Sequence, residues 1–276
     1  MADFLNILEQ SETEKRSMLC FGMDPVVERM QIDASKSLSD EITRYFSDIL
    51  HVIKDKVSAV KPNVAFYLQY GHDGISALGE LIERAHKLGL PVIVDLKCGD
   101  IGRTSKAYAQ FVFHTLGGDA VTLNPLMGND ALEPFFSCTE RGFFVLALTS
   151  NPGAAVIQLA RLHDGITLSE RLVSLICGWN RRVPSIGAVL GATQDEFERC
   201  IRQIQKEGAE IPLLIPGVGA QGGSYRKIER ILSEHSYKRG VVRINASSAI
   251  AYAHERFPDT PPDEAAWRAC EEILGQ

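Results

Sequence analysis

Short apolar runs recur along the chain, and a segment with helical periodicity follows each of them. The runs are rich in Val, Ile, Leu and Phe, and their apolar residues are contiguous rather than alternating with polar ones. Contiguous runs of this length are typical of parallel strands that are buried on both faces. The pattern predicts eight such strands, at residues 18–24, 57–63, 91–97, 120–125, 143–149, 185–192, 211–217 and 241–246.

The segments between these runs have the spacing of amphipathic helices. Residues 39–54 place their apolar side chains on one stripe, which is the pattern of a helix that packs on a core. Ser39, followed by two acidic residues, predicts the start of this helix, because Ser caps helix N-termini and acids favour the first turn. Residues 71–88 and 193–207 have the same character, and Thr193 opens the second with a capping-box pattern.

Eight strand–helix units in 276 residues predict an α/β fold of the (β/α)8 TIM-barrel type. A doubly wound open sheet is the structural alternative. No linker or low-complexity segment interrupts the pattern, so we expect a single domain over residues 1–276. The longest connections that follow a strand are residues 25–36 and 151–182, and long connections of this kind usually serve the active face of a barrel.

Composition and charge exclude several classes of protein. Hydrophobic residues make up 45% and charged residues 23% of the chain, which is ordinary for a folded globular protein. The net charge is −6 without a run of Lys or Arg, so binding to nucleic acid or to an anionic membrane is not expected. No apolar stretch approaches the ~20 residues of a membrane helix, and the N-terminus has no signal-peptide pattern.

The cysteines and histidines give no indication of a metal site. The six cysteines form no CxxC pair, and no two histidines lie three or four residues apart. We therefore expect no structural zinc site and reduced thiols, as in a cytoplasmic protein.

Charged residues at the ends of the predicted strands are the main indication of chemistry. Asp95, Lys97 and Asp100 end the third run, while Asp24 and Lys61 end the first and second. Barrel active sites lie at the carboxyl ends of the strands. Asp95 and Lys97, two apart on an extended strand, are expected to point the same way. Such charges hold one another ionised; the alternative is an ion-pair network that only closes the barrel.

The spacing Asp-x-Lys-x-x-Asp-Ile, from Asp95 to Ile101, resembles the signature of the orotidine 5′-phosphate decarboxylase family. The resemblance covers nearly the whole chain and is strongest to the longer bacterial branch of that family. Six further stretches, each at a predicted strand end, carry it: residues 22–25, 61–63, 119–125, 149–153, 191–193 and 216–223.

The resemblance implies a metal-free and cofactor-free decarboxylation of orotidine 5′-phosphate to UMP, a step of pyrimidine biosynthesis. Lys97 would stabilise the carbanion at carbon 6 and protonate it. Asp95 would lie beside the substrate carboxylate and disfavour the ground state. Lys61 and Asp100 would complete the array and fix Lys97, and Asp24 together with Lys61 would contact ribose hydroxyls.

The resemblance also implies the contacts to the base and a partner subunit. Ser150 would hydrogen-bond the pyrimidine edge. Asp100, Ile101 and Thr104 would reach into the active site of a second subunit, so a homodimer with shared active sites is expected. Two-fold dimers are also the commonest oligomers.

The phosphate of the substrate is expected at the loops that follow the seventh and eighth strands. Residues 216–223 are rich in glycine, and glycines let backbone N–H groups approach an anion. By resemblance, Pro216, Gly222 and Ser247 contact the substrate, and Gln221 bridges phosphate and base as a lid. The stretch also has G-x-G-x-x-G spacing, but a dinucleotide fingerprint belongs in the opening βαβ unit of a sheet.

One position departs from the family pattern. The resemblance places a phosphate-binding arginine directly after Ser247, where this chain has Ser248. Arg–phosphate pairs are strong and geometrically specific. Three interpretations follow. Phosphate is bound by backbone N–H groups, a helix N-terminus and the hydroxyls of Ser247 and Ser248; or another arginine replaces the missing one, Arg103 rather than Arg243; or the substrate is a modified pyrimidine nucleoside or nucleotide.

Two alternatives come from other classes. Barrels that act on keto-sugar phosphates have a related Asp-x-Lys-x-x-Asp arrangement but use a divalent metal, and Ser150 and Gln221 argue against that assignment. A non-catalytic nucleotide-binding relative is the second alternative. It is disfavoured because Asp95, Lys97 and Asp100 are all retained.

Overall fold

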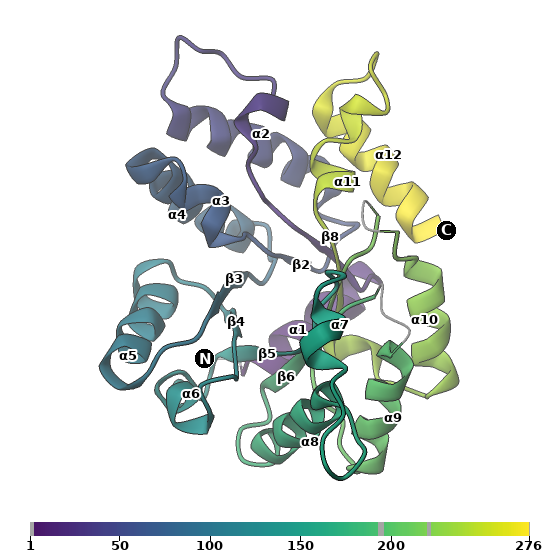
Figure 1. Ribbon diagram of the computed structural model, residues 1–276. Helices are drawn as coiled ribbons and strands as arrows, with labels where there is room; N and C mark the ends of the chain where they lie inside the picture. The colour runs from purple at the N-terminus through teal and green to yellow at the C-terminus, as the bar shows by residue number, and fades with distance from the viewer. Residues whose placement is uncertain (1–2, 193–195, 220–221, 276) are drawn as a thin grey trace.

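The eight apolar runs form eight parallel strands in the computed structural model, which describes residues 3–192, 196–219 and 222–275 (Figure 1). The (β/α)8 prediction is therefore confirmed. Each strand overlaps its predicted run: β1 Leu19–Phe21, β2 Ala59–Val60, β3 Ile93–Cys98, β4 Ala120–Leu123, β5 Gly142–Leu148, β6 Ile186–Leu190, β7 Leu213–Pro216 and β8 Val242–Ala246. Six strands lie wholly within their runs, whereas β3 ends one residue later than predicted and β5 begins one residue earlier.

The sheet closes into a barrel. Its strand order is β2-β1-β8-β7-β6-β5-β4-β3, so the first strand lies beside the last, with Leu19 opposite Ile244. The two end strands, β2 and β3, are joined by a parallel bridge between Val60 and Val92. A doubly wound sheet has two free edges and a reversal of strand order, so the open-sheet alternative is wrong.

Helices surround the strands on the outside of the barrel, as Figure 1 shows. The described α-helices are α1 Phe4–Lys15, α2 Leu38–Ile53, α3 Val64–Leu68, α4 Gly71–Lys87, α5 Gly102–Gln110, α6 Asn129–Phe136, α7 Ala154–Gln158, α8 Leu168–Asn180, α9 Phe197–Lys206, α10 Tyr225–Glu234, α11 Ser248–Ala251 and α12 Pro262–Gly275. The described residues also form three short 3₁₀-helices, η1 Val27–Arg29, η3 Arg239–Val241 and η4 Ala253–Glu255, and one π-helical turn, η2 Phe111–Thr115. None of the described helices is long and apolar enough to cross a membrane.

Two predicted helix starts differ from the structure. The cap of α2 is Ser37, whose side chain accepts a hydrogen bond from the Asp40 N–H at 3.1 Å. The prediction of Ser39 was wrong because two serines precede the acidic first turn and the earlier one takes the cap. α9 begins at Phe197, later than predicted, and the expected cap Thr193 lies outside the described residues.

The inside of the barrel is filled by a small apolar cluster that includes side chains from α1. Phe4 and Leu8 are buried with residues of the strands, and the ring of Phe4 meets that of Phe144 edge to face at 6.0 Å. Helix α1 therefore closes the N-terminal end of the barrel, and the carboxyl ends of the strands stay open.

Arg243 belongs to this closed end. Its side chain is fully buried and donates to the backbone carbonyls of Leu8, Val242 and Ser58 at 2.5, 2.7 and 3.3 Å. Burial lowers the pKa of Arg243 to about 10. Its hydrogen bonds are made to the backbone beneath the barrel, so Arg243 is not a candidate for a phosphate ligand at the open end.

Candidate active site

A cavity of about 570 Å³ lies at the carboxyl ends of the strands. Eight of the residues singled out from the sequence line it, namely Asp24, Lys61, Asp95, Lys97, Ser150, Pro216, Ser247 and Ser248. They come from strands far apart along the chain, and the barrel brings their ends together. This volume lies within the range of about 300–1,000 Å³ for small-molecule sites.

The carboxylate of Asp95 is the centre of the polar cluster in this cavity. Asp95 is 4% exposed and accepts hydrogen bonds from three side chains. Lys61 Nζ lies 2.8 Å from Oδ2, Lys97 Nζ lies 2.5 and 2.6 Å from the two oxygens, and Thr122 Oγ1 lies 2.7 Å from Oδ1. The predicted meeting of Asp95, Lys97 and Lys61 is therefore seen in the structure.

The charges of this cluster hold one another ionised. Burial acts to raise the pKa of Asp95, but the ammonium groups of Lys61 and Lys97 outweigh it and hold that pKa well below its usual range. Burial acts in the opposite direction on Lys61, and the carboxylates of Asp95 and Asp24 hold the pKa of Lys61 above its usual range. Asp95 is thus a permanent anion and Lys61 a permanent cation at neutral pH.

The backbone at Lys97 is not regular strand. Its φ is +48°, and the pairing of β3 with β4 shifts register between Val94 and Cys98. The Lys97 N–H donates to Thr122 Oγ1 at 3.0 Å. The contact of Lys97 with Asp95 was predicted, but from an extended strand; a bulge produces it instead. A non-glycine residue in this region of φ is strained, and such strain gathers at functional sites.

Asp24 and Lys61 are fixed by the backbone of the first two strand ends. The Asn63 N–H donates to Asp24 Oδ1 at 3.1 Å, and Tyr252 Oη donates to the Asp24 carbonyl at 2.7 Å. The Lys61 N–H donates to the Phe21 carbonyl at 2.7 Å. Both side chains therefore enter the cavity from a rigid base.

Asp100, Ile101 and Thr104 lie apart from this cluster within one chain. Among the described residues that line the cavity, none of the three appears. Asp100 Oδ1 accepts the N–H of Ile101 at 2.7 Å, Ile101 is 59% exposed, and Thr104 is exposed on α5. A single chain thus does not place Asp100 in the array with Lys97. Arg103, on the same helix, is exposed and outside the cavity.

Backbone hydrogen bonds join the described parts of the glycine-rich stretch after β7. The Gly222 N–H donates to the Gly219 carbonyl at 2.8 Å, and the Gly223 N–H donates to that of Gly217 at 3.0 Å. Gly217 has a φ of +106° and lines the cavity beside Pro216, whereas Gly222 is not among the described lining residues. Gln221, predicted to cover the substrate, lies outside the described residues.

Polar residues at the end of β8 line the cavity. Asn245 Nδ2 donates to Ser247 Oγ at 3.2 Å, while Asn245 Oδ1 is buried and has no hydrogen-bond partner among the described residues. Ser248 lines the cavity next to Ser247. A Cβ at Gly22 would lie 1.8 Å from Ser247 Oγ, so glycine at that position permits the close approach of β1 to Ser247.

Comparison with known proteins assigns the chain to a family. The model of the orotidine 5′-phosphate decarboxylase / HUMPS family matches residues 17–256. The chain belongs to this family. Orotidine 5′-phosphate decarboxylase of Thermomicrobium roseum is 39% identical over 93% of this chain and 90% of its own length, and that of Roseiflexus castenholzii is 40% identical over 91% and 89%. The solved Leishmania donovani OMP decarboxylase superposes with a TM-score of 0.78, at 28% identity over 99% of this chain and 98% of its own.

Several residues in the cavity of this family member were not singled out from the sequence. Thr122 is one of them, although a polar residue inside the apolar run 120–125 is a detectable signal. Arg29 and Tyr252 are others, and neither lies at a predicted strand end. Among the described residues, no three His, Cys, Asp or Glu side chains are grouped so as to hold a metal ion.

Proposed function

We propose that this chain decarboxylates orotidine 5′-phosphate to UMP without a metal or an organic cofactor. The observation that carries the proposal is the alternating cluster of Lys61, Asp95 and Lys97, held around one buried carboxylate at the wall of the cavity. Membership in the orotidine 5′-phosphate decarboxylase / HUMPS family, and relatives named as that decarboxylase over about nine tenths of their length, support it.

The bond between carbon 6 and the substrate carboxylate breaks in this reaction. Carbon dioxide leaves, and the electron pair remains on carbon 6 as a vinylic carbanion. Lys97 Nζ donates a proton to that carbon, so that one proton is consumed per UMP formed, and the amine then regains a proton from water. The ammonium group stabilises the carbanion as its charge develops.

Asp95 acts on the starting state. Its carboxylate is 2.5 Å from Lys97 Nζ, so a substrate carboxylate placed at Lys97 meets a second negative charge that cannot be protonated at neutral pH. This repulsion disappears when carbon dioxide departs. Lys61 and Thr122 hold Asp95 in place, and its low pKa prevents it from taking the proton meant for carbon 6.

Other residues predicted from the sequence bind the rest of the nucleotide in this proposal. Asp24 and Lys61 contact the ribose hydroxyls, and Ser150 contacts the pyrimidine edge. Pro216, Gly222, Ser247 and Ser248 form the phosphate end, together with Gln221. The hydroxyls of Ser247 and Ser248 give this end O–H donors that a phosphate can accept.

A homodimer with shared active sites is part of the proposal. Asp100, Ile101 and Thr104 follow β3 outside the cavity of their own chain. Leu126 and Met127 follow the neighbouring strand β4 and are 66% and 54% exposed. Exposed apolar side chains after two neighbouring strands suit a surface that a second copy covers. In the dimer, Asp100 then completes the charged array of the partner's site.

Two further predictions from the sequence stay predictions. A single domain over residues 1–276 agrees with one continuous core that runs from Met18 to Ile273. The cytoplasmic location rests on the sequence alone.

The test is the loss of pyrimidine absorbance when the purified protein is mixed with orotidine 5′-phosphate, with and without EDTA, and with orotidine in parallel. Fast turnover of the nucleotide that EDTA does not affect, with little action on orotidine, is expected. Turnover abolished by EDTA would indicate a metal-dependent enzyme. No turnover by the folded protein would point to a modified pyrimidine substrate or a binding role.

A further inference from the structure

The cavity contains a third cation that the proposed reaction has not used. Lys61 and Lys97 both bond to Asp95, at the end where the substrate carboxylate reacts. Arg29 is the other Lys or Arg among the described residues that line the cavity. Orotidine 5′-phosphate carries its phosphate at the opposite end from the reacting carboxylate, so a cation away from Asp95 is where a phosphate ligand belongs.

The guanidinium of Arg29 is held in a fixed plane. Its Nε and Nη2 donate to the two carboxylate oxygens of Glu255 at 2.7 and 2.6 Å. Its central carbon lies 4.1 Å from the centre of the Tyr252 ring. Within the part of the chain that the structure describes, the Nη1 nitrogen has no acceptor. A planar group held in this way is ready to bind an anion without ordering first.

Arg29 shares one corner of the cavity with the two serines after β8. The Tyr252 N–H donates to the Ser248 carbonyl at 3.1 Å, so the ring under the guanidinium lies one helical turn from Ser248. Ser247, Ser248, Tyr252 and Arg29 all line the same cavity. The position that the family resemblance gives to a phosphate-binding arginine is thus close to an arginine from another part of the chain.

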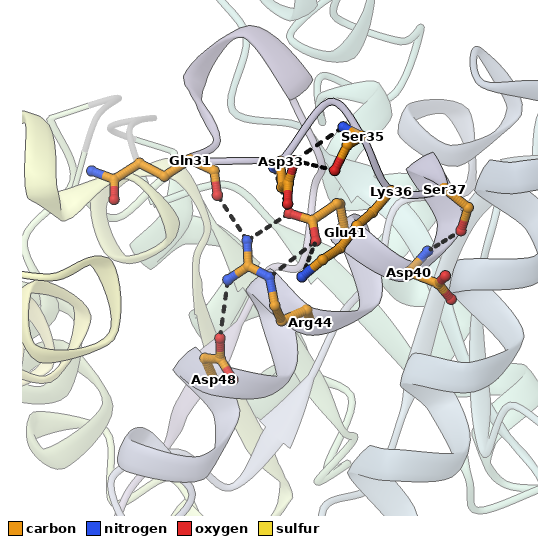
Figure 2. A network of polar contacts seen from close by, with 9 residues as sticks. All are labelled: Gln31, Asp33, Ser35, Lys36, Ser37, Asp40, Glu41, Arg44 and Asp48. Atoms are coloured by element: carbon orange, nitrogen blue, oxygen red, sulfur yellow. Dashed lines mark hydrogen bonds and ion pairs between the residues drawn. The ribbon is translucent and has the colours of Figure 1, made fainter.

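The connection that carries Arg29 is tied to α2, as Figure 2 shows. Glu41 of α2, 1% exposed, accepts from the Asp33 N–H and from Arg44 Nη2, both at 2.8 Å. Arg44 Nη2 also donates to the Gln31 carbonyl at 2.8 Å. These bonds fix residues 31 to 33, directly after η1, so the placement of Arg29 does not depend on a loose loop.

We propose that Arg29 binds the 5′-phosphate of the substrate, together with the hydroxyls of Ser247 and Ser248, and so selects nucleotides over nucleosides. This inference rests on the proposed function. The other two arginines considered from the sequence are placed unsuitably within their own chain, since Arg103 is exposed outside the cavity and Arg243 is buried at the closed end.

The test compares the binding of the product UMP with that of uridine, by calorimetry on the full-length protein. Arg29→Met removes the charge and keeps an unbranched apolar side chain over Tyr252. Arg29→Lys keeps the charge but lacks the planar set of N–H donors of the guanidinium. The Kd for UMP is expected to rise on the order of 10- to 100-fold in Arg29→Met, the range for a lost charged hydrogen bond. The Kd for uridine should stay unchanged. The Kd of Arg29→Lys for UMP should lie between those of the wild type and Arg29→Met.

Two arginine variants serve as controls. Arg230→Met removes an exposed arginine of α10 that pairs with Glu234 and should leave both affinities unchanged. Arg103→Met tests the partner's arginine at the shared site. A selective loss of UMP binding in Arg103→Met, with none in Arg29→Met, would overturn the inference. So would an equal loss of UMP and uridine in Arg29→Met, because Arg29 would then only maintain the shape of the cavity.

Binding of the product does not require turnover, so the two proposals fail separately. A wild-type protein that prefers UMP through Arg29 but releases no carbon dioxide contradicts the proposed function and supports the role of Arg29 in binding phosphate. A protein that decarboxylates the nucleotide, and whose preference for UMP over uridine survives in Arg29→Met, contradicts the inference and leaves the proposed function standing.

Discussion

The two ends of the barrel bury charge in opposite ways. At the closed end, Arg243 is satisfied by backbone carbonyls, and burial lowers its pKa to about 10. At the open end, Asp95 is satisfied by two ammonium groups, and its pKa moves strongly in the direction that keeps it charged. A buried charge bonded to backbone reinforces the fold. Alternating side-chain charges at the wall of a cavity remain available to a ligand, which is the arrangement expected of an active site.

The largest expected effect is the loss of turnover in Lys97→Ala, at the open end. The substitution removes the proton donor and the cation at carbon 6, so kcat should fall by about 10⁴-fold or more. Lys97 is half-exposed, so thermal unfolding should change little. Steady-state turnover and the Kd for UMP measure the two effects. Near-normal turnover in this variant would remove Lys97 from the mechanism.

Asp95→Asn is expected to have the next largest effect. It leaves Lys61 buried without the carboxylate that it bonds to, and the loss of one partner of a buried pair costs about 3–5 kcal/mol of unfolding free energy. Urea unfolding of the variant and the wild type at neutral pH measures this difference. Equal stabilities would mean that the cluster does not depend on the charge of Asp95.

The pH dependence of that difference has a definite sign. The folded-state pKa of Asp95 is lowered, so its contribution is present above the unfolded value of ~3.9. It is lost as the pH falls through the folded-state pKa. The difference in unfolding free energy between the wild type and Asp95→Asn should therefore shrink on acidification below about pH 4. A gap that grows there would contradict the assignment.

Arg243→Met tests the closed end in the same terms. It removes the side-chain donor to the carbonyls of Leu8 and Val242, and the unfolding free energy should fall by about 2 kcal/mol. Turnover per folded molecule should not change, because the side chain does not line the cavity. A loss of kcat at full stability would show that the two ends are coupled.

Mixed dimers test whether the site at the open end includes residues of a second subunit. The recovery of turnover expected from them is the smallest of these effects. Lys97→Ala and Asp100→Ala chains are each expected to be inactive alone. After they are unfolded and refolded together, random pairing restores one intact site in each mixed dimer, so about a quarter of wild-type turnover should return. No recovery, with mixed dimers present by mass spectrometry, would place Asp100 in its own chain's site or outside both.

The regular parts of this molecule are predictable from sequence because they depend on local pattern. Each apolar run became a strand, and Lys61, Asp95 and Lys97 met because parallel strands end at one face. The exceptions depend on contacts between distant segments. The bulge that sets Lys97 requires Thr122 of β4, and the place of Arg29 requires Tyr252 and Glu255, more than 220 positions away. Helix α1, which closes the barrel, lies outside the strand–helix repeat.

The most direct test of the central claim is the source of the hydrogen that the product carries at carbon 6. The wild-type protein is incubated with orotidine 5′-phosphate in heavy water containing EDTA, and the product is examined by proton NMR. A proton delivered from the exchangeable ammonium of Lys97 predicts UMP with deuterium at carbon 6 and one carbon dioxide per UMP from the wild-type protein, and neither product from Lys97→Ala. Unchanged substrate, or loss of activity that added metal restores, would contradict the assignment of the reaction to this cluster.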